Sequence, residues 1–451
     1  MRLSVAEAAV RVGGQVGARA AAAHFSRVVV DSRQAGPDSL FVALPGTRTH
    51  GAHFAGAAQA LGAVVLMAAP LPADVDTKRV WRHDDPLAAL GGVGRWALEC
   101  TGARVVGITG SVGKSSTRAL VQAVLGGSFR VGATPGNLNT AIGLPMALVA
   151  QPTPLDWFVA EMGMRAAGEI TRLTAIAPPS VAVLTNIGYA HVGQLGSVEA
   201  VAEAKAEILA GLTAGDVAVL NGADPRVARL ARRVAGRVVW FGTPDADVEV
   251  RAVRAERGGV AFELRMGAET ARVRLPWDGV HQADNAAAAA AVAGALGLPL
   301  AEVAARLGQA SAADSHFRRV VVGGITILDD TYNASPASVR AGLAVLAQER
   351  GRRVAVVGDM LELGSTEEAL HRELGTAAAA CADLVWTVGD RARWVAEAAC
   401  AAGVPTSVFS GLDELAAALD RELQAGDVVY LKAGRAVGLD RVARQLMEDH
   451  R

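Results

Sequence analysis

Short apolar runs alternate with segments of helical periodicity along most of the chain. Residues 27–44 (RVVVDSRQAGPDSLFVAL) indicate a strand, a turn and a second strand, because proline and glycine separate two runs rich in valine and leucine. Residues 52–68 indicate a helix followed by a strand. A further helix is expected over residues 83–102, with Asp84 or Asp85 as its N-cap.

The same alternation continues to about residue 314 and then restarts. Strands expected in the first stretch lie at 103–110, 156–162, 180–187 and 216–221. Strands expected in the second stretch lie at 324–330, 352–360, 383–390 and 427–434. Strands that alternate with helices predict a mostly parallel sheet. The alanine-rich run at 281–297 is expected to be helical, because alanine is the best helix former.

The composition is typical of a folded globular protein, with 51% hydrophobic and 20% charged residues. The net charge of -1 argues against a global field for nucleic acid or anionic membranes. The three cysteines are far apart and lack metal-ligand spacing, so no disulfide framework is expected. The first residues are charged throughout, without the apolar core of a signal peptide, and no apolar stretch is long enough to span a membrane. A cytoplasmic protein is therefore expected.

Lysine is rare in this chain. Only four of the 44 basic residues are lysines: Lys78, Lys114, Lys205 and Lys432. A lysine that persists in an arginine-rich background could stand where a guanidinium cannot do the chemistry, since only lysine offers a compact, titratable amine. Chance is the alternative, because four is a small number.

A phosphate-binding loop is the clearest single motif. The strand at 103–110 leads into GSVGKSST and then into a helix, so Gly110, Ser111, Val112 and Gly113 would direct backbone N–H groups at phosphate oxygens. Lys114 would reach the β- and γ-phosphates, and Ser115 or Ser116 would ligate Mg²⁺. The motif is the short GxxGK[ST] variant, with Ile108 where the longer pattern has glycine. By itself it indicates a nucleoside triphosphate and no particular reaction.

With this loop the chain predicts an α/β protein of three domains, because 451 residues exceed one hydrophobic core. We expect a small α/β domain over residues 1–83 and a central P-loop ATPase-like domain with a parallel sheet over residues 84–314. A Rossmann-like doubly wound domain is expected over residues 315–451.

Three further residues are candidates for chemistry, each with an ordinary alternative. Glu161 ends an apolar strand and could hold Mg²⁺, or could be a surface or capping carboxylate. His191 follows a predicted strand end, where a structural histidine is the alternative. Lys205 lies in a predicted helix, where a solvated lysine is the alternative.

The ordered motifs of the whole chain resemble the Mur ligase family. They are DSR and LFVALPGTRTHGAHF, GITGSVGKSST, TPGNLNTAIGLP, AEMGMRAAGEI, LTNIGYAHVGQLGSVEAVAEAKAEIL, LNGADP, GVHQADNAAAA, DDTYNASPASVRAGL, VVGDMLELG and LKAGR. YNASP with GDMLELG favours the dipeptide-adding member of the family. The resemblance implies ATP-dependent ligation of D-alanyl-D-alanine to UDP-N-acetylmuramoyl-tripeptide through an acyl phosphate, with two Mg²⁺ ions, in peptidoglycan precursor synthesis. A monomer is expected.

The resemblance also implies roles for individual residues. The residues implied in catalysis are Lys114, Glu161, His191 and a carbamylated Lys205, the last three acting with Ser115 on metal. The residues implied in ATP binding beyond the loop are Gly279, His281, Asn285, Asp330 and either Arg318 or Arg319. The residues implied in binding the peptide substrates are Asn137, Asn139, Asn333, Ser335, Lys432 and Arg435. The residues implied in binding the uridine nucleotide are Asp31, Ser32, Arg33 and Thr47.

Simpler interpretations of several of these residues stay open. Asn137 and Asp330 could be turn residues, and Asn285 could be a helix N-cap. Lys432 and Arg435 could be ordinary surface charges. Departures from the family pattern occur at His50, Thr140 and Gln282.

Two other functions also fit the sequence. One is a sister ligase of the same chemistry, either the enzyme that adds the third peptide residue, whose DNPR-like signature is not found here, or a folylpolyglutamate-type synthetase. The other is an ATP-gated binding protein without turnover.

Overall fold

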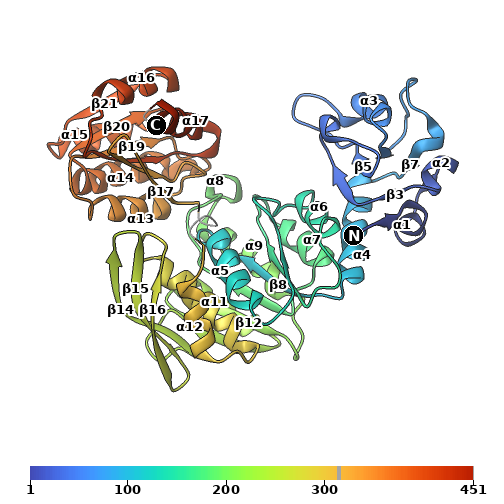
Figure 1. The fold of residues 1–451 in the computed structure, drawn as a ribbon, viewed down its shortest axis with the longest axis horizontal. Helices are drawn as coiled ribbons and strands as arrows, with labels where there is room; N and C mark the ends of the chain where they lie inside the picture. The colour runs from blue at the N-terminus through green and yellow to red at the C-terminus, as the bar shows by residue number, and fades with distance from the viewer. Residues whose placement is uncertain (312–315, 450–451) are drawn as a thin grey trace.

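Three large sheets, each accompanied by helices, follow one another along the chain in the structure, a computed structural model that describes residues 1–311 and 316–449. Figure 1 shows them as three lobes, coloured blue, cyan to yellow, and orange to red. We call them the N-terminal, central and C-terminal units. Within the described residues, no helix is both long and apolar enough to cross a membrane.

The N-terminal unit is built on a five-stranded sheet in the order β2-β7-β6-β5-β4, parallel except for β2. Its strands are β2 (Gln15–Val16), β4 (Arg27–Val29), β5 (Ser39–Val42), β6 (Val64–Met67) and β7 (Val80–Arg82), with a separate pair β1 (Leu3–Ser4) and β3 (His24–Phe25). Its helices are α1 (Val5–Val12), α2 (Ala18–Ala21) and α3 (Ala55–Ala60), with 3-10 turns η1 (Ser32–Gln34), η2 (Gly51–Phe54) and η3 (Thr77–Arg79). The strand–turn–strand and helix–strand predictions are confirmed.

The central sheet has nine strands in the order β16-β15-β14-β13-β12-β11-β8-β10-β9. They are β8 (Arg104–Thr109), β9 (Val131–Ala133), β10 (Trp157–Glu161), β11 (Val181–Leu184), β12 (Val217–Asn221), β13 (Arg237–Phe241), β14 (Val248–Glu256), β15 (Gly259–Met266) and β16 (Glu269–Leu275). The sheet is parallel from β9 to β14, as predicted. The antiparallel pairing of β14, β15 and β16 was not predicted. It forms because Gly258 and Gly267, both with positive φ, allow two tight reversals.

Helices cover both faces of this sheet. They are α4 (Pro86–Thr101), α5 (Lys114–Gly126), α6 (Gly143–Val149), α7 (Glu169–Ile176), α8 (Val192–Leu195), α9 (Val198–Ala206), α10 (Pro225–Leu230), α11 (Gln282–Ala295) and α12 (Leu300–Gly308), with η4 (Glu207–Leu209) and η5 (Ala231–Arg233). Asp85 caps α4 as predicted, since its carboxylate accepts from the N–H groups of Leu87 and Ala88. The alanine-rich segment forms α11, and its small side chains let it pack closely against α5 and the sheet.

The C-terminal unit has a six-stranded sheet in the order β17-β18-β22-β19-β20-β21, parallel except for β17. Its strands are β17 (Arg318–Val322), β18 (Ile325–Asp329), β19 (Arg353–Gly358), β20 (Leu384–Val388), β21 (Thr406–Phe409) and β22 (Val428–Lys432). Its helices are α13 (Pro336–Leu346), α14 (Glu367–Cys381), α15 (Arg393–Ala401), α16 (Leu412–Glu422) and α17 (Asp440–Asp449), with η7 (Gly364–Thr366) and η8 (Arg435–Val437). All four strands predicted for this segment are present.

The N-terminal and central units share a hydrophobic core, whereas the C-terminal unit has its own. One apolar cluster runs without a break from Leu66 and Trp81 in the N-terminal sheet to Val93 and Leu144 in the central unit. The C-terminal unit has two large hydrophobic clusters of its own, and among the described residues both contain only residues from Phe317 onward. The domain boundary predicted at 83/84 thus crosses a continuous core, and the boundary predicted at 314/315 lies outside the described residues. The domain limits stay a prediction.

Candidate active site between the central and C-terminal units

A cavity of about 1020 Å³ lies at the carboxyl ends of the central strands and reaches the C-terminal unit. Carboxyl ends of parallel strands are where such sheets bind ligands. The cavity brings together most of the residues singled out in the sequence. They are Ser111, Val112, Gly113, Lys114, Ser115, Ser116, Asn137, Asn139, Glu161, His191, Lys205, His281, Asn285, Asp330, Asn333, Ser335, Lys432 and Arg435.

The phosphate loop joins β8 to α5. Gly113 precedes the first turn of α5 as its N-cap and has φ 83°. Only glycine adopts this left-handed conformation without strain. The two residues that follow β11 hold the loop in place. The Val112 N–H donates to Asn186 Oδ1 (3.0 Å), and Thr185 Oγ1 donates to the Val112 carbonyl (2.7 Å). The free N–H groups at the start of α5 therefore face the cavity in a fixed arrangement that suits an anion.

Two lysines converge on the loop from different helices. Lys114 Nζ donates to the Gly110 carbonyl (2.8 Å), and Lys205 Nζ donates to the same carbonyl (3.0 Å). Burial lowers the pKa of Lys114, which Glu161 partly opposes. Burial, and then the charge of Lys114, lower the pKa of Lys205 well below its ordinary value. Lys205 is 1% exposed, so the interpretation as a solvated helix lysine is wrong.

Glu161 ends β10 with its carboxylate held on both oxygens. Oε2 accepts from Ser115 Oγ (2.8 Å), and Oε1 accepts from Asn139 Nδ2 (2.7 Å). Glu161 is 3% exposed, so a surface carboxylate is excluded. The Arg118 Nε lies 3.8 Å from Oε2. A carboxylate beside the serine of a phosphate loop fits Mg²⁺, which takes one or two carboxylates plus phosphate oxygens.

The protein alone does not complete a metal site. Among the described residues, no three His, Cys, Asp or Glu side chains form a group that could hold a metal ion. A cation beside Glu161 would therefore need nucleotide phosphate oxygens or water as further ligands, as is usual for Mg²⁺.

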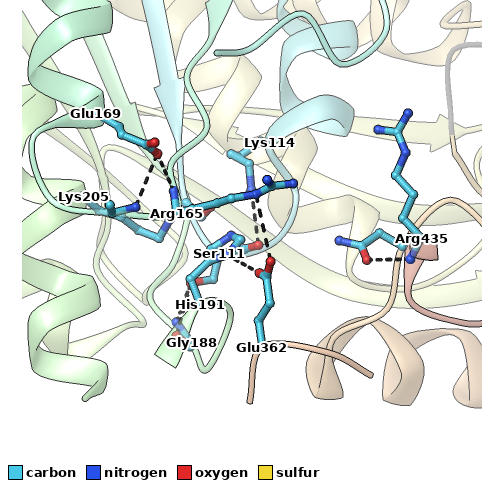
Figure 2. A network of polar contacts seen from close by, with 12 residues as sticks. Ser111, Lys114, Arg165, Glu169, Gly188, His191, Lys205, Glu362 and Arg435 are labelled. Carbon is cyan, nitrogen blue, oxygen red and sulfur yellow. Dashed lines mark hydrogen bonds and ion pairs between the residues drawn. The ribbon is translucent and has the colours of Figure 1, made fainter. Parts of the chain in front are cut away.

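His191 meets the C-terminal unit. It has φ 68°, and its Nδ1 lies 2.5 Å from Oε2 of Glu362, on the loop after β19. Figure 2 shows the Glu362 carboxylate directed at the His191 ring, next to Ser111 and Lys114. Burial lowers the pKa of His191, Glu362 opposes that shift, and Lys205 and Lys114 reinforce it.

His281 and Asn285 lie on α11, across the loop from Glu161. His281 caps α11, its Nδ1 is buried without a hydrogen bond to any described residue, and burial lowers its pKa to about 4. A buried nitrogen without a partner in the described chain is suited to contact a ligand. Asn285 lies inside the helix, so the N-cap interpretation is wrong. Its Oδ1 accepts from Thr117 Oγ1 (3.3 Å), and its Nδ2 donates to Gln282 Oε1 (2.9 Å).

The C-terminal wall of the cavity is polar. Lys432 Nζ lies 2.5 Å from Asp330 Oδ2, and Tyr430 donates to the same oxygen (3.3 Å). Burial raises the pKa of Asp330, and Lys432 opposes the shift. Lys432 is 2% exposed, so the surface-charge interpretation is wrong for it.

Arg435 reaches back toward the central unit. Its N–H donates to Asn333 Oδ1 (3.3 Å), and its guanidinium lies 5.5 Å from the centre of the Tyr332 ring. Ser335 caps α13 in a capping box with Ser338. These residues therefore hold the loop after β18 against the cavity.

The two candidate arginines of β17 have different surroundings. Arg319 donates to Asp278 and Glu349 and is largely enclosed. Arg318 pairs with Asp329, has a side chain 55% exposed, and does not line the cavity. An ATP contact by either stays a prediction.

The predicted uridine-site residues lie apart from this cavity. Asp31 and Arg33 form an ion pair (2.6 Å) around η1, and Thr47 is exposed on the loop after β5. Hydrogen bonds to Arg33 lower the pKa of Asp31. All lie in the N-terminal lobe, which Figure 1 shows well separated from the C-terminal lobe.

Comparison with known proteins gives this arrangement a family. Residues 24–80 match the Mur ligase family catalytic domain, residues 108–293 the Mur ligase middle domain, and residues 317–435 the Mur ligase glutamate ligase domain. A UDP-N-acetylmuramoyl-tripeptide--D-alanyl-D-alanine ligase from Mycobacterium tuberculosis is 36% identical over 100% of this chain and 98% of its own length.

The chain belongs to the Mur ligase family. Two solved structures agree with this assignment. A MurF crystal structure from Acinetobacter baumannii has a TM-score of 0.88 at 29% identity and covers 99% of both chains. A MurF ligase from Thermotoga maritima in complex with ADP has a TM-score of 0.82 at 29% identity, covering 94% of this chain and 97% of that one.

Several residues of this Mur ligase site were not singled out in the sequence. Thr185 and Asn186 shape the loop, Arg118 approaches Glu161, and Glu362 holds His191. Thr185 and Asn186 could have been found, because they end a strand next to β8. Glu362 lies inside the motif VVGDMLELG, but its contact with His191 could not be found, because no local pattern pairs residues so far apart in the chain.

Proposed function

We propose that this chain joins D-alanyl-D-alanine to UDP-N-acetylmuramoyl-tripeptide with conversion of ATP to ADP and phosphate, in peptidoglycan precursor synthesis. The observation that carries the proposal is the cavity in which the phosphate loop, Glu161 and Lys205 face the buried Asp330–Lys432 pair of the C-terminal unit. Full-length relatives that bear this activity in their names support it.

The carboxylate of the tripeptide attacks the γ-phosphorus of ATP, the bond to the ADP oxygen breaks, and an acyl phosphate forms. Lys114 and the N–H groups of the loop stabilise the charge on the transferring phosphoryl group. The dipeptide amine then attacks the acyl carbonyl, and phosphate leaves with the bonding pair and takes up the proton that the amine loses. The residues act by positioning and electrostatics, with no covalent enzyme intermediate.

Glu161 and Ser115 would hold one Mg²⁺, and His191 with a modified Lys205 would hold a second. Bound Mg²⁺ would neutralise charge on the phosphate oxygens. Ser115 and Asn139 already fix the direction of the Glu161 carboxylate. The donor set is therefore oriented before any cation arrives.

Lys205 is suited to carbamylation by CO₂. The reaction needs a neutral amine, and burial next to Lys114 lowers the pKa of Lys205. The product is an anion, which would lie beside Lys114 and remove their mutual repulsion. Arginine cannot react in this way.

The remaining contacts divide between the units. Asp31, Ser32, Arg33 and Thr47 bind the uridine nucleotide. His281, Asn285, Asp330 and Arg318 contact ATP. Asn137, Asn139, Asn333, Ser335, Lys432 and Arg435 contact the peptide substrates. Closure of the C-terminal unit protects the acyl phosphate from water.

Mass spectrometry of the reaction product tests the proposal. With Mg-ATP, UDP-N-acetylmuramoyl-tripeptide and D-alanyl-D-alanine, we expect the UDP-pentapeptide, and phosphate release that requires both acceptor and dipeptide. Release with a UDP-dipeptide and a single amino acid would support a sister ligase. Release with a folate acceptor and glutamate would support the folylpolyglutamate-type alternative. Tight ATP binding without release would support a binding protein.

A further inference from the structure

The central and C-terminal units contact each other at a joint formed by His191, Gly193, Glu362 and Gly364, where two residues other than glycine have positive φ. His191 of the central unit and Glu362 of the C-terminal unit both adopt the left-handed region, with φ of 68° and 67°. That conformation is unfavourable for a residue other than glycine, because its Cβ lies too close to the following carbonyl oxygen. Both residues belong to the same contact, so the surrounding structure holds them against this cost, which is typical of functional sites.

The backbones approach so closely that only glycine fits. The Gly193 N–H donates to the Glu362 carbonyl (2.9 Å). A Cβ on Gly193 would lie 2.9 Å from the Gly364 nitrogen, and a Cβ on Gly364 would lie 2.9 Å from the Gly193 Cα. This close approach fixes how α8 and the loop before η7 lie against each other, and it places the Glu362 side chain beside His191.

The docked side chain sets the chemistry of the His191 ring. Nδ1 lies 2.5 Å from the Glu362 carboxylate. Because an ionised carboxylate can only accept a hydrogen bond, Nδ1 is the donor of this contact. In a neutral imidazole the other nitrogen then carries the lone pair. That nitrogen, Nε2, makes no hydrogen bond to the part of the chain that the structure describes, and His191 lines the cavity. The other Glu362 oxygen lies 4.0 Å from the Arg165 guanidinium, as Figure 2 illustrates.

We propose that Glu362 is a positioning residue that reaches across the joint and presents His191 Nε2 to a divalent cation held with the nucleotide phosphates. This inference rests on the proposed function. A carboxylate behind a metal-binding imidazole fixes its tautomer and ring direction. Because Glu362 comes from the C-terminal unit, docking of that unit and binding of the cation favour each other by the same factor.

The proposal is tested with Mn²⁺ as the probe and a β,γ-methylene analogue of ATP, in the full-length protein. We expect Glu362→Ala to weaken Mn²⁺ binding, followed by electron paramagnetic resonance, about 10- to 100-fold. The matched control is Glu368→Ala, an exposed carboxylate on the neighbouring α14 that pairs with Arg372. It should bind Mn²⁺ as the wild type does.

A second readout follows the tautomer itself. Long-range ¹H–¹⁵N spectra of histidine-labelled protein, with His191→Gln for assignment, should show the His191 proton on Nδ1 in the wild type. In Glu362→Ala it should move to Nε2, which is the default tautomer. Should Glu362→Ala not fold, Glu362→Gln replaces it. The amide oxygen still accepts from Nδ1, so the tautomer should persist while Mn²⁺ binding weakens by less than about 10-fold, and a proton found on Nε2 in this variant would overturn the positioning role.

The possible outcomes separate the two hypotheses. Unchanged Mn²⁺ affinity or an unchanged tautomer in Glu362→Ala overturns the positioning role, even if the wild type makes the UDP-pentapeptide. Absence of that product in the wild type overturns the proposed function. A kcat that falls in Glu362→Ala and recovers in part in Glu362→Gln, with KM for the UDP-peptide unchanged, supports both.

Discussion

Substituting Gly113 by alanine perturbs the phosphate loop at a position with a positive φ and no room for a Cβ atom. The residue has φ 83°, and an added Cβ would lie 2.5 Å from Asn285 Oδ1. Alanine in this conformation costs about 1–2 kcal/mol. Asn285 is 8% exposed and would have to move, which would disturb its bonds to Thr117 and Gln282. An unsatisfied buried amide costs about 1–3 kcal/mol.

Together these effects predict that Gly113→Ala destabilises the protein by about 2–5 kcal/mol. The N-terminal and central units share a core, so one thermal transition should report the loss, with a midpoint lowered by about 5–10 °C. ADP affinity, measured by isothermal titration calorimetry, should fall at least about tenfold, because a displacement costing 1.4 kcal/mol already does so.

The same helix offers a control of opposite sign. Gly126 ends α5, lies in an ordinary helical conformation, and an added Cβ would meet nothing within 4 Å. Gly126→Ala should therefore leave ADP binding unchanged and raise stability by up to about 1 kcal/mol, because alanine loses less backbone entropy. If Gly113→Ala matched the wild type in both midpoint and ADP affinity, the clash and the assignment of the loop would be refuted.

Three further predictions concern the charged groups of the site. Lys205→Arg should lower the rate of phosphate release in the full reaction by about 10²- to 10³-fold, since arginine cannot be carbamylated and one stabilising group is lost. Activity near that of the wild type would contradict the proposed carbamylation of Lys205. Glu161→Gln should weaken Mn²⁺ binding by about 10- to 100-fold while the protein stays folded, as checked by circular dichroism, because Gln still accepts from Ser115. Burial lowers the pKa of His281 to about 4, so between pH 6.5 and pH 4 the unfolded chain binds a proton that the folded state does not. The stability that neutral His281 contributes above pH 6.5 is therefore lost as the pH falls toward 4. Urea unfolding of the wild type and His281→Gln should show that the wild type loses about 2 kcal/mol more than the variant between pH 7 and pH 5; equal losses would show that His281 is not buried in this way.

The sequence by itself determined the elements and the family. Apolar runs bounded by glycine and proline marked the strands that bear the site, because strand and helix periodicities are local properties of the chain. The phosphate loop was readable because its glycines, lysine and serine are contiguous. The antiparallel strands β14 to β16 were not predicted. Most of β14 is exposed, and its charged residues leave only a weak apolar pattern.

The tertiary structure decided which of the candidate groups share a cavity. Lys205 has the sequence of a surface helix lysine, yet the packing of α9 buries it against the Gly110 carbonyl. Lys432 resembled a surface charge and instead pairs with Asp330 inside the C-terminal unit. The contact of Glu362 with His191 depends on how two separately folded units dock. Burial, pKa and charge pairing are properties of three-dimensional neighbours, and the order of residues along a chain does not specify them.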